Sequence, residues 1–308
     1  MSHFTVLVVT DNGTDEQITC ALQPFHEYEC TGVKDEYVVA VEAEESREEL
    51  LKDFDELYKD DYESFDQFLK GYYGYEELNG KVIRWTNPNY KWDWWMVGGR
   101  WRGMLMINGE TREALSHKRA LQNKRKPIPD SLIEKTKGVR LGDPSWTNLN
   151  ENVPVDVVDS ARKHQIDFDG MMRLEKDRAR KDYKTFHEIL GDGTFLTWEE
   201  CLAKQPDDVK AAREEYNGQS VIKEFNEVFG PFLDLSSFLK PEEDYVNEKA
   251  ESAFSTFAVL YNGEWVEKGR MGWWACVTNE NKEWAKDYQS ILDSIPDDKY
   301  LTVVDCHI

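Results

Sequence analysis

Apolar and polar positions divide the chain into two strand-rich ends and a helical middle. Near the N-terminus, β-branched residues dominate positions 4–9 (FTVLVV), and the turn signal Asp11-Asn12-Gly13 follows. Near the C-terminus, positions 254–261 and 300–306 have the same strand character. Because the strands of one domain share a hydrophobic core, we expect both ends of the chain to contribute to one sheet.

The N-terminal part contains further strands and one helix. Strands are expected at positions 37–41, 81–85, 92–97 and 102–107, with the last two joined as a hairpin across Gly98-Gly99. In such a hairpin, Arg100 and Arg102 point to one strand face and Trp101 to the other. A helix is expected after Ser46, because apolar residues recur there at helical spacing and Glu49 completes a capping box.

The middle of the chain, from about position 110 to 251, is polar, charged and mostly helical in pattern. Helices are expected within positions 159–190 and again after Thr197. The whole pattern predicts an α+β (α/β) fold with a discontinuous mixed sheet. We expect residues 1–108 plus 254–308 to form the sheet domain, and residues 109–253 to form a mostly helical inserted domain.

Composition indicates whether the protein can form a stable core and where in the cell it is expected. The chain has 308 residues, 40% of them hydrophobic, so a stable core can form without disulfides or metals. It has no run of 18 apolar residues, and its first residues lack the basic region and cleavage site of a signal peptide. We interpret the five cysteines as mostly reduced thiols, and we expect a cytoplasmic protein that binds no membrane.

Charge is strongly negative and unevenly distributed. The net charge is −22, and residues 41–80 hold fourteen Asp or Glu against four Lys or Arg. Residues 111–140 are basic instead, and positions 117–126 and 173–181 have the composition of phosphate-binding stretches. The overall acidity nevertheless argues against direct nucleic-acid binding. It favours basic partners, including the DNA-binding faces of other proteins, although a purely solubilising surface is the simpler alternative.

The segment KWDWWMVGGRWRG, residues 91–103, is the first candidate ligand site. Its arginines can hold a phosphate or carboxylate while its tryptophans stack on a base. Alternatively, the tryptophans fill a core and the arginines pair with the abundant carboxylates. The segment contains no phosphate-binding loop motif. The candidate ligand or interaction residues are Trp94, Trp95, Arg100, Trp101 and Arg102.

A second candidate is a zinc site that joins the two ends of the chain. His26 and Cys30 are four residues apart, and Cys306 and His307 could complete a four-ligand set if the termini meet. Such a site is structural, or it is catalytic with Glu27 as general base. The alternative is a loop without metal, since no C-x-x-C pair occurs. Overall we expect no cofactor and no catalytic residues, because the sequence contains no nucleophile elbow and no ordered triad.

Four stretches together resemble a family of phage and prophage proteins: MSHFTVLVV, LQPFHEYECTG, KWDWWMVGGRWRG and YLTVVDCHI. Within that family the chain is similar to Gabija anti-defence proteins. The resemblance implies a non-enzymatic phage inhibitor that assembles as a homo-oligomer in the host bacterial cytoplasm. It also implies a partner, the host Gabija nuclease–helicase complex, whose access to DNA the inhibitor occludes. The alternatives are a small-ligand or nucleotide-binding enzyme with a Trp/Arg pocket at 94–102, or a zinc-stabilised binding module.

Overall fold

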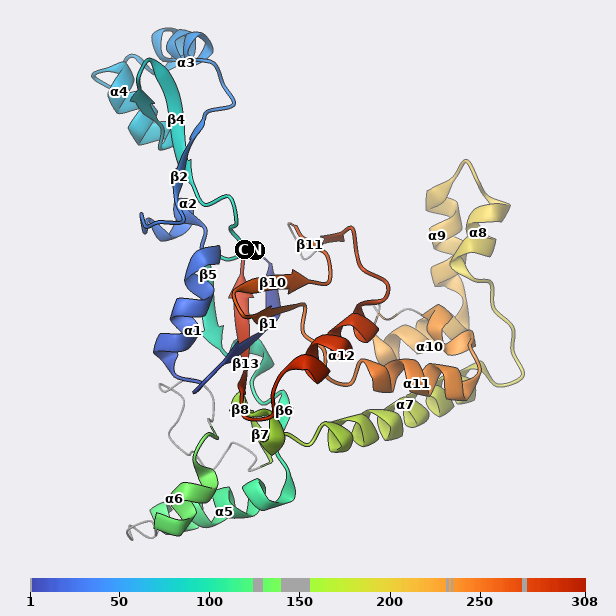
Figure 1. Cartoon of the computed structure of the whole chain (residues 1–308). Coiled ribbons are helices and arrows are strands. Elements are labelled where there is room, and N and C mark those ends of the chain that lie inside the picture. The colour runs from blue at the N-terminus through green and yellow to red at the C-terminus, as the bar shows by residue number, and fades with distance from the viewer. Residues whose placement is uncertain (1, 124–129, 140–155, 231–232, 234, 273–275) are drawn as a thin grey trace. The chain divides into compact units, whose positions relative to one another are not determined.

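The structure is a computed structural model that describes residues 2–123, 130–139, 156–230, 233, 235–272 and 276–308 (Figure 1). The fold is α+β, with 49% helix and 21% strand. The chain forms two compact units. The first, which we name the sheet unit, comprises residues 1–166, 256–284 and 291–308. The second, which we name the helical unit, comprises residues 167–255 and 285–290.

The sheet unit is built on a mixed sheet to which both ends of the chain contribute, as the strand pattern predicts. The two terminal strands, β1 (His3–Thr10) and β13 (Tyr300–His307), lie antiparallel and pair along their whole length. β1 also pairs in parallel with β9 (Ala258–Tyr261), which forms a hairpin with β10 (Glu264–Glu267). On its other side, β13 pairs with β5 (Trp94–Val97) and with β8 (Ser160–Arg162).

Strand alternation gives the central sheet two different faces. On one face, Phe4, Val6 and Val304 pack with Ile18 and Leu22 of helix α1 (Asp15–Leu22) in the main hydrophobic core. On the opposite face, the cross-strand pairs His3↔His307 and Thr5↔Asp305 bring polar side chains together. The pairing of β1 with β13 therefore places polar residues from the two chain ends side by side.

The segment after β5 differs from the predicted hairpin. β5 pairs with β13, and β6 (Leu105–Met106) pairs with β7 (Val157–Val158), so these two strands do not pair with each other. Between them, Gly99–Trp101 forms one 3-10 turn. A β-carbon on Gly98 would lie 2.6 Å from the Asp159 carboxylate, and one on Gly99 would lie 2.4 Å from Asp305. The two glycines thus allow the backbone to pass close to two buried carboxylates. The predicted hairpin is wrong, because the prediction took into account only the local turn chemistry.

A small lobe of the sheet unit spans residues 39–86, and we name it the acidic lobe. Its three strands lie in the order β2 (Val39–Glu42), β4 (Lys81–Thr86), β3 (Glu76–Leu78). Its helical segments are α3 (Arg47–Asp53), η2 (Phe54–Tyr58), α4 (Phe65–Phe68) and η3 (Leu69–Tyr73). The predicted capping box is confirmed, since the amide of Glu49 donates to Ser46 and the amide of Ser46 donates to Glu49. The lobe has its own apolar core around Leu50, Phe54 and Phe68.

The sheet unit has one longer helix besides these elements, α5 (Gly109–Asn123). Its remaining elements are short, and they are η1 (Gln23–Phe25), α2 (Tyr28–Thr31), η4 (Gly99–Trp101), α6 (Asp130–Thr136), η5 (Lys163–Gln165), β11 (Arg270–Met271) and β12 (Val277–Thr278). The sheet unit extends to residue 166, beyond the expected limit of 108, because β8 returns to pair with β13. The same pairing makes residues 160–162 a strand, whereas the sequence pattern predicts a helix from position 159.

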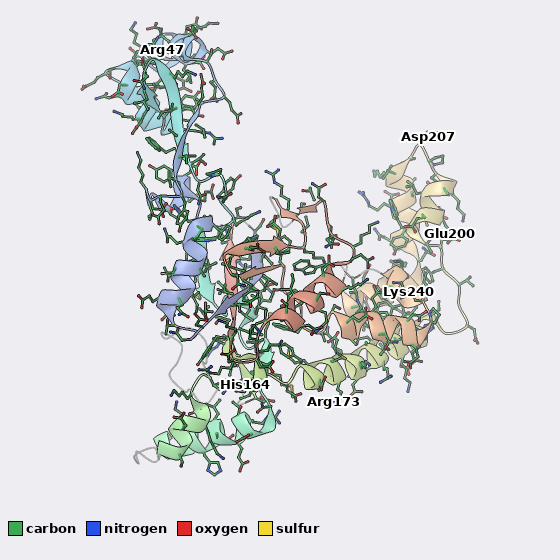
Figure 2. The ribbon with its side chains drawn as sticks, in the orientation of Figure 1. Arg47, His164, Arg173, Glu200, Asp207 and Lys240 are labelled. Atoms are coloured by element: carbon green, nitrogen blue, oxygen red, sulfur yellow. The ribbon has the colours of Figure 1, made fainter. Side chains whose placement is uncertain are left out.

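The helical unit packs its helices around an aromatic core that includes Phe186, Phe225 and Phe238. Its elements are α7 (Phe168–Leu190), α8 (Trp198–Lys204), α9 (Val209–Gly218), α10 (Ser220–Phe229), η6 (Leu235–Leu239), α11 (Glu242–Glu251) and part of α12 (Trp284–Ser294). The predicted start of α8 is confirmed: Thr197 and Glu200, the latter labelled in Figure 2, form a capping box. Among the described helices, none combines the length and the apolar composition that crossing a membrane requires.

Candidate functional site

The candidate site lies where three segments of the sheet unit meet at one end of β13. Backbone hydrogen bonds hold these segments together. The amide of Glu27 donates to the carbonyl of Trp92 over 2.7 Å, and the amide of Asp93 donates to the carbonyl of His307 over 3.0 Å. Asn87 adds a side-chain bond to the carbonyl of His26. The first turn after η1, the residue before β5 and the end of β13 are thereby fixed beside one another.

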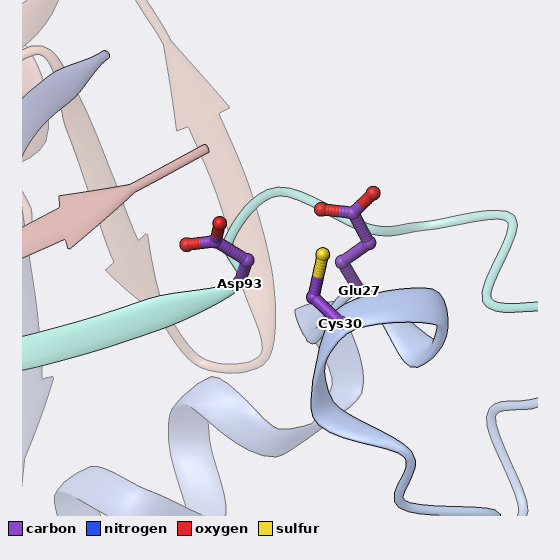
Figure 3. A group of neighbouring side chains, drawn as sticks. All are labelled: Glu27, Cys30 and Asp93. Atoms are coloured by element: carbon purple, nitrogen blue, oxygen red, sulfur yellow. The ribbon is translucent and has the colours of Figure 1, made fainter. Parts of the chain in front are cut away.

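Four chemically active side chains come from these three segments. Cys30 projects from the single turn of α2, Glu27 is the residue directly before that turn, and Asp93 approaches them from the position directly before β5 (Figure 3). One ligand atom from each of the three lies within 4.8 Å of the others. His307 holds Asp93 from the other side, because its Nδ1 lies 2.6 Å from the Asp93 Oδ1. The arrangement joins residues that are up to 280 positions apart, from Glu27 to His307.

The cluster crowds acidic groups in a partly buried place. Burial raises the pKa of Glu27; the hydrogen bond from the Cys30 thiol opposes this rise, while the charges of Glu29 and Asp93 add to it. Burial and the neighbouring Glu27 carboxylate raise the pKa of Cys30 to about 11. The thiol is therefore protonated at neutral pH, and it donates a hydrogen bond to Glu27. A nucleophilic thiolate requires a depressed pKa, so Cys30 is not poised as a nucleophile.

A cavity of about 1230 Å³ opens beside this cluster, and Glu27, Cys30, Asp93 and His307 all line it. Its other walls include apolar and aromatic side chains such as Trp265, together with the charged Arg270. Concave, largely apolar spaces with a few convergent polar groups are typical of small-molecule sites. The cavity lies wholly within the sheet unit.

The zinc set predicted from the sequence is not assembled. Cys30 and His307 both line the large cavity, but Cys306 lies on the opposite face of β13, buried in the main core. Burial raises the pKa of that thiol well above its usual value. The His26 ring is buried and engaged by Thr31, 2.8 Å from its Nδ1, and by Asp35. The correction has a simple cause, because neighbouring residues of a strand point to opposite faces of the sheet.

The candidate ligand residues of the Trp/Arg segment separate in a similar way. Trp94, Arg100 and Arg102 line a smaller cavity of about 270 Å³. Trp95 and Trp101 are not among its lining residues, and Trp95 packs against the main core instead. The segment at positions 94–102 thus contributes Trp95 to the hydrophobic core, and Trp94, Arg100 and Arg102 to the wall of the smaller cavity.

Two buried aspartates support this smaller cavity, and both line it. Asp305 accepts a hydrogen bond from the amide of Arg100 over 3.0 Å and pairs with His3, whose Nδ1 lies 2.8 Å away. Asp159 accepts a hydrogen bond from the amide of Gly103. Both carboxylates therefore hold the turn in place.

Sequence reasoning missed Asp93, Asp159, Asp305 and His3. Asp93 and Asp159 are single acidic residues directly beside short strands, and a chain with sixty acidic residues offers such positions in abundance. Asp305 and His3 carry one available signal: each is an ionisable residue within a strand that consists mostly of apolar and β-branched residues. A polar residue that faces inward from such a strand is buried and needs a partner.

Comparison with known proteins yields no match among protein-family models, curated proteins or solved structures. The interpretation of the site therefore depends on its geometry and chemistry.

Proposed function

We propose that this protein is a phage-encoded inhibitor that binds and occludes a bacterial defence complex, the Gabija nuclease–helicase, without catalysing a reaction. It works in the host bacterial cytoplasm as a homo-oligomer, in line with the sequence resemblance. The acidic lobe is the contact surface, and its partner is a basic surface that otherwise binds DNA. The observation that carries the proposal is a group of exposed carboxylates on this lobe that have no ion-pair partner.

The charges of the acidic lobe are only partly compensated. Three of the four basic residues at positions 41–80 form ion pairs within the lobe, among them Arg47, which is labelled in Figure 2 and lies 3.2 Å from Glu77. In this fully described segment, eight exposed acidic residues form no ion pair, and they are Glu44, Glu48, Glu49, Glu56, Asp60, Asp61, Glu63 and Glu76. Unpaired charges of one sign produce a field that steers an oppositely charged partner and accelerates association.

The lobe also exposes apolar side chains among these carboxylates. Leu57 is 67% exposed and Tyr72 is 52% exposed. Protein interfaces typically combine aromatic or aliphatic anchors with a polar rim. This combination favours a protein partner.

The basic stretches predicted from the sequence give little support for the alternative of phosphate binding. The stretch at positions 173–181 lies on α7, where Arg173, Arg178 and Arg180 each lie within 4.0 Å of a carboxylate, as on an ordinary solvated helix (Figure 2). Part of the other stretch, at positions 117–126, lies outside the described residues.

The test compares two variants with the same change in net charge. The lobe variant carries Glu56→Gln, Asp60→Asn, Asp61→Asn and Glu63→Gln. The control variant carries four substitutions at exposed acidic positions of the helical unit, and these are Asp192→Asn, Glu199→Gln, Asp207→Asn and Glu227→Gln.

Complex formation with the purified defence complex is measured by mass photometry and titration. Four exposed ion pairs of about 0.5 kcal/mol each amount to about 2 kcal/mol, or a roughly thirtyfold weaker Kd for the lobe variant. We expect the control variant to bind like the unmodified protein. The proposal fails if the unmodified protein forms no complex, or if both variants weaken binding equally.

A second candidate function is small-ligand binding or turnover, and the cavity of about 1230 Å³ specifically favours it. Nucleotides are the first ligands to test, because the smaller cavity adds Arg100, Arg102 and the exposed Trp94. Calorimetric titration with nucleotides, repeated on the Arg100→Ala/Arg102→Ala variant, measures this directly. No heat of binding for any nucleotide rejects the nucleotide form of this candidate.

A further inference from the structure

The cluster of Glu27, Cys30 and Asp93 has the composition of a transition-metal site. It offers one sulfur and two carboxylate ligands, all converging within 4.8 Å. Zinc accepts this mixture, because it is borderline-soft and binds both thiolate and carboxylate. Magnesium and calcium prefer oxygen ligands alone, so the cysteine argues for the softer ion.

The spacing of the three groups suits a small tetrahedral ion. Zn–S and Zn–O bonds of about 2.3 and 2.1 Å place neighbouring ligand atoms roughly 3.4–3.6 Å apart in a tetrahedron. In the structure, the ligand atoms of Glu27, Cys30 and Asp93 lie within 4.8 Å of one another, which exceeds the tetrahedral spacing by little more than 1 Å at most. Rotation of the Glu27 side chain, which extends from the residue before α2, can close this difference without moving the sheet.

The surroundings also resemble those of a metal site. Metal ligands are usually held by a second residue, and His307 holds Asp93 at 2.6 Å. Without a cation, the carboxylates of Glu27 and Asp93 face each other and a thiol in a half-buried place. A divalent cation compensates this concentration of negative charge and replaces the hydrogen bond between Cys30 and Glu27.

The fourth coordination position faces open space. All three ligands line the cavity of about 1230 Å³, so an ion among them has protein on one side and the cavity on the other. Structural zinc sites are closed by four protein ligands, whereas sites that act on a ligand keep one position open.

We infer that Glu27, Cys30 and Asp93 bind one zinc ion, that His307 positions Asp93, and that the open coordination position faces the large cavity. This set of ligands replaces the one predicted from the sequence. Cys30 remains a ligand, His307 holds the ligand Asp93 and is not itself a ligand, and His26 and Cys306 are excluded. The site is separate from the acidic lobe, so the inference holds whether or not the lobe binds a defence complex.

The test uses the full chain, purified with a chelator and then dialysed free of it. Zinc binding is measured by isothermal titration calorimetry. Cobalt serves as a spectroscopic probe, because a cobalt–thiolate bond gives a charge-transfer band in the near ultraviolet. We expect one equivalent of zinc to bind and the cobalt band to appear.

Three variants locate the ion. Cys30→Ser removes the cobalt band and weakens zinc binding at least tenfold, and Asp93→Asn weakens zinc binding while retaining the band. The matched control is Cys20→Ser, which changes another exposed free thiol of the same unit and leaves both readouts unaltered. Circular dichroism of each variant verifies folding.

Three results overturn the inference. The first is binding of less than a tenth of an equivalent of zinc to the unmodified protein. The second is a cobalt band that persists in Cys30→Ser, and the third is a band that disappears in Cys20→Ser. His307→Gln tests the positioning role: we expect a ten- to hundredfold loss of zinc affinity with the band retained, as for residues that orient a ligand. An unchanged affinity removes His307 from the site.

Discussion

The close approach of Gly99 to Asp305 gives a quantitative prediction about stability. Gly99 has a φ of +51°, and an added β-carbon would lie 2.4 Å from both the β-carbon and one carboxylate oxygen of Asp305. Asp305 is 1% exposed, and it lies on β13, which is paired with β1 on one side and with β5 on the other. Gly99→Ala must therefore displace either the turn or the carboxylate.

The expected cost has two parts. A residue with a β-carbon in the left-handed region costs about 1–2 kcal/mol. Displacing Asp305 also weakens its hydrogen bond from the Arg100 amide and its pairing with His3, and a hydrogen bond to a charged group is worth about 1.5–3 kcal/mol. Together these predict that Gly99→Ala lowers the free energy of unfolding by about 2.5–5 kcal/mol.

Gly263→Ala is the matched control. Gly263 has a φ of +78°, but nothing lies within 4 Å of its added β-carbon, so this variant costs only the backbone part, about 1–2 kcal/mol. Both free energies are measured by urea unfolding followed through tryptophan fluorescence. If Gly99→Ala costs no more than Gly263→Ala, the close approach to Asp305 contributes nothing to stability and the reasoning is refuted.

Two further predictions concern local stability and pH. Ser46→Ala removes the capping box of α3 and costs about 1 kcal/mol, measurable as faster hydrogen exchange of the α3 amides; unchanged exchange would contradict it. Burial, with the charges of Asp182 and Glu175, raises the pKa of Tyr245 to about 12, so the folded state keeps a proton that the unfolded state loses above pH 10. The free energy of unfolding therefore falls between about pH 10 and 12, by up to about 1.4 kcal/mol per pH unit, and Tyr245→Phe abolishes this fall. Equal slopes in alkaline urea unfolding of the two proteins would disprove it.

Much of the fold could be predicted because it follows from short-range rules. Continuous β-branched runs in FTVLVV and YLTVVDC identify the terminal strands, and Ser46 and Thr197 identify helix starts through caps that span three residues. These signals depend on the geometry of one turn or one pleat, which the neighbouring residues determine. The expectation of one mixed sheet built from both chain ends is confirmed.

Errors arose wherever a distant segment outweighed the local pattern. The Gly98-Gly99 turn suits a hairpin locally, but β5 pairs with β13, more than 200 residues away. Residues 160–162 read as part of a helix, yet hydrogen bonds to β13 make them a strand. The free energy that a backbone segment gains by forming its hydrogen bonds in a central sheet exceeds the small local preference for another secondary structure.

The candidate site shows the same division between local pattern and tertiary structure. By itself, the sequence determined which chemical groups are available. These are an acidic surface at positions 41–80, and Cys30 and His307 as possible metal ligands near the two chain ends. Only the tertiary structure decided that His307 contacts Asp93 while Cys306 lies in the core. The reason is physical: the register between β1, β13 and β5 selects which face each side chain occupies, and a shift of one residue would exchange them.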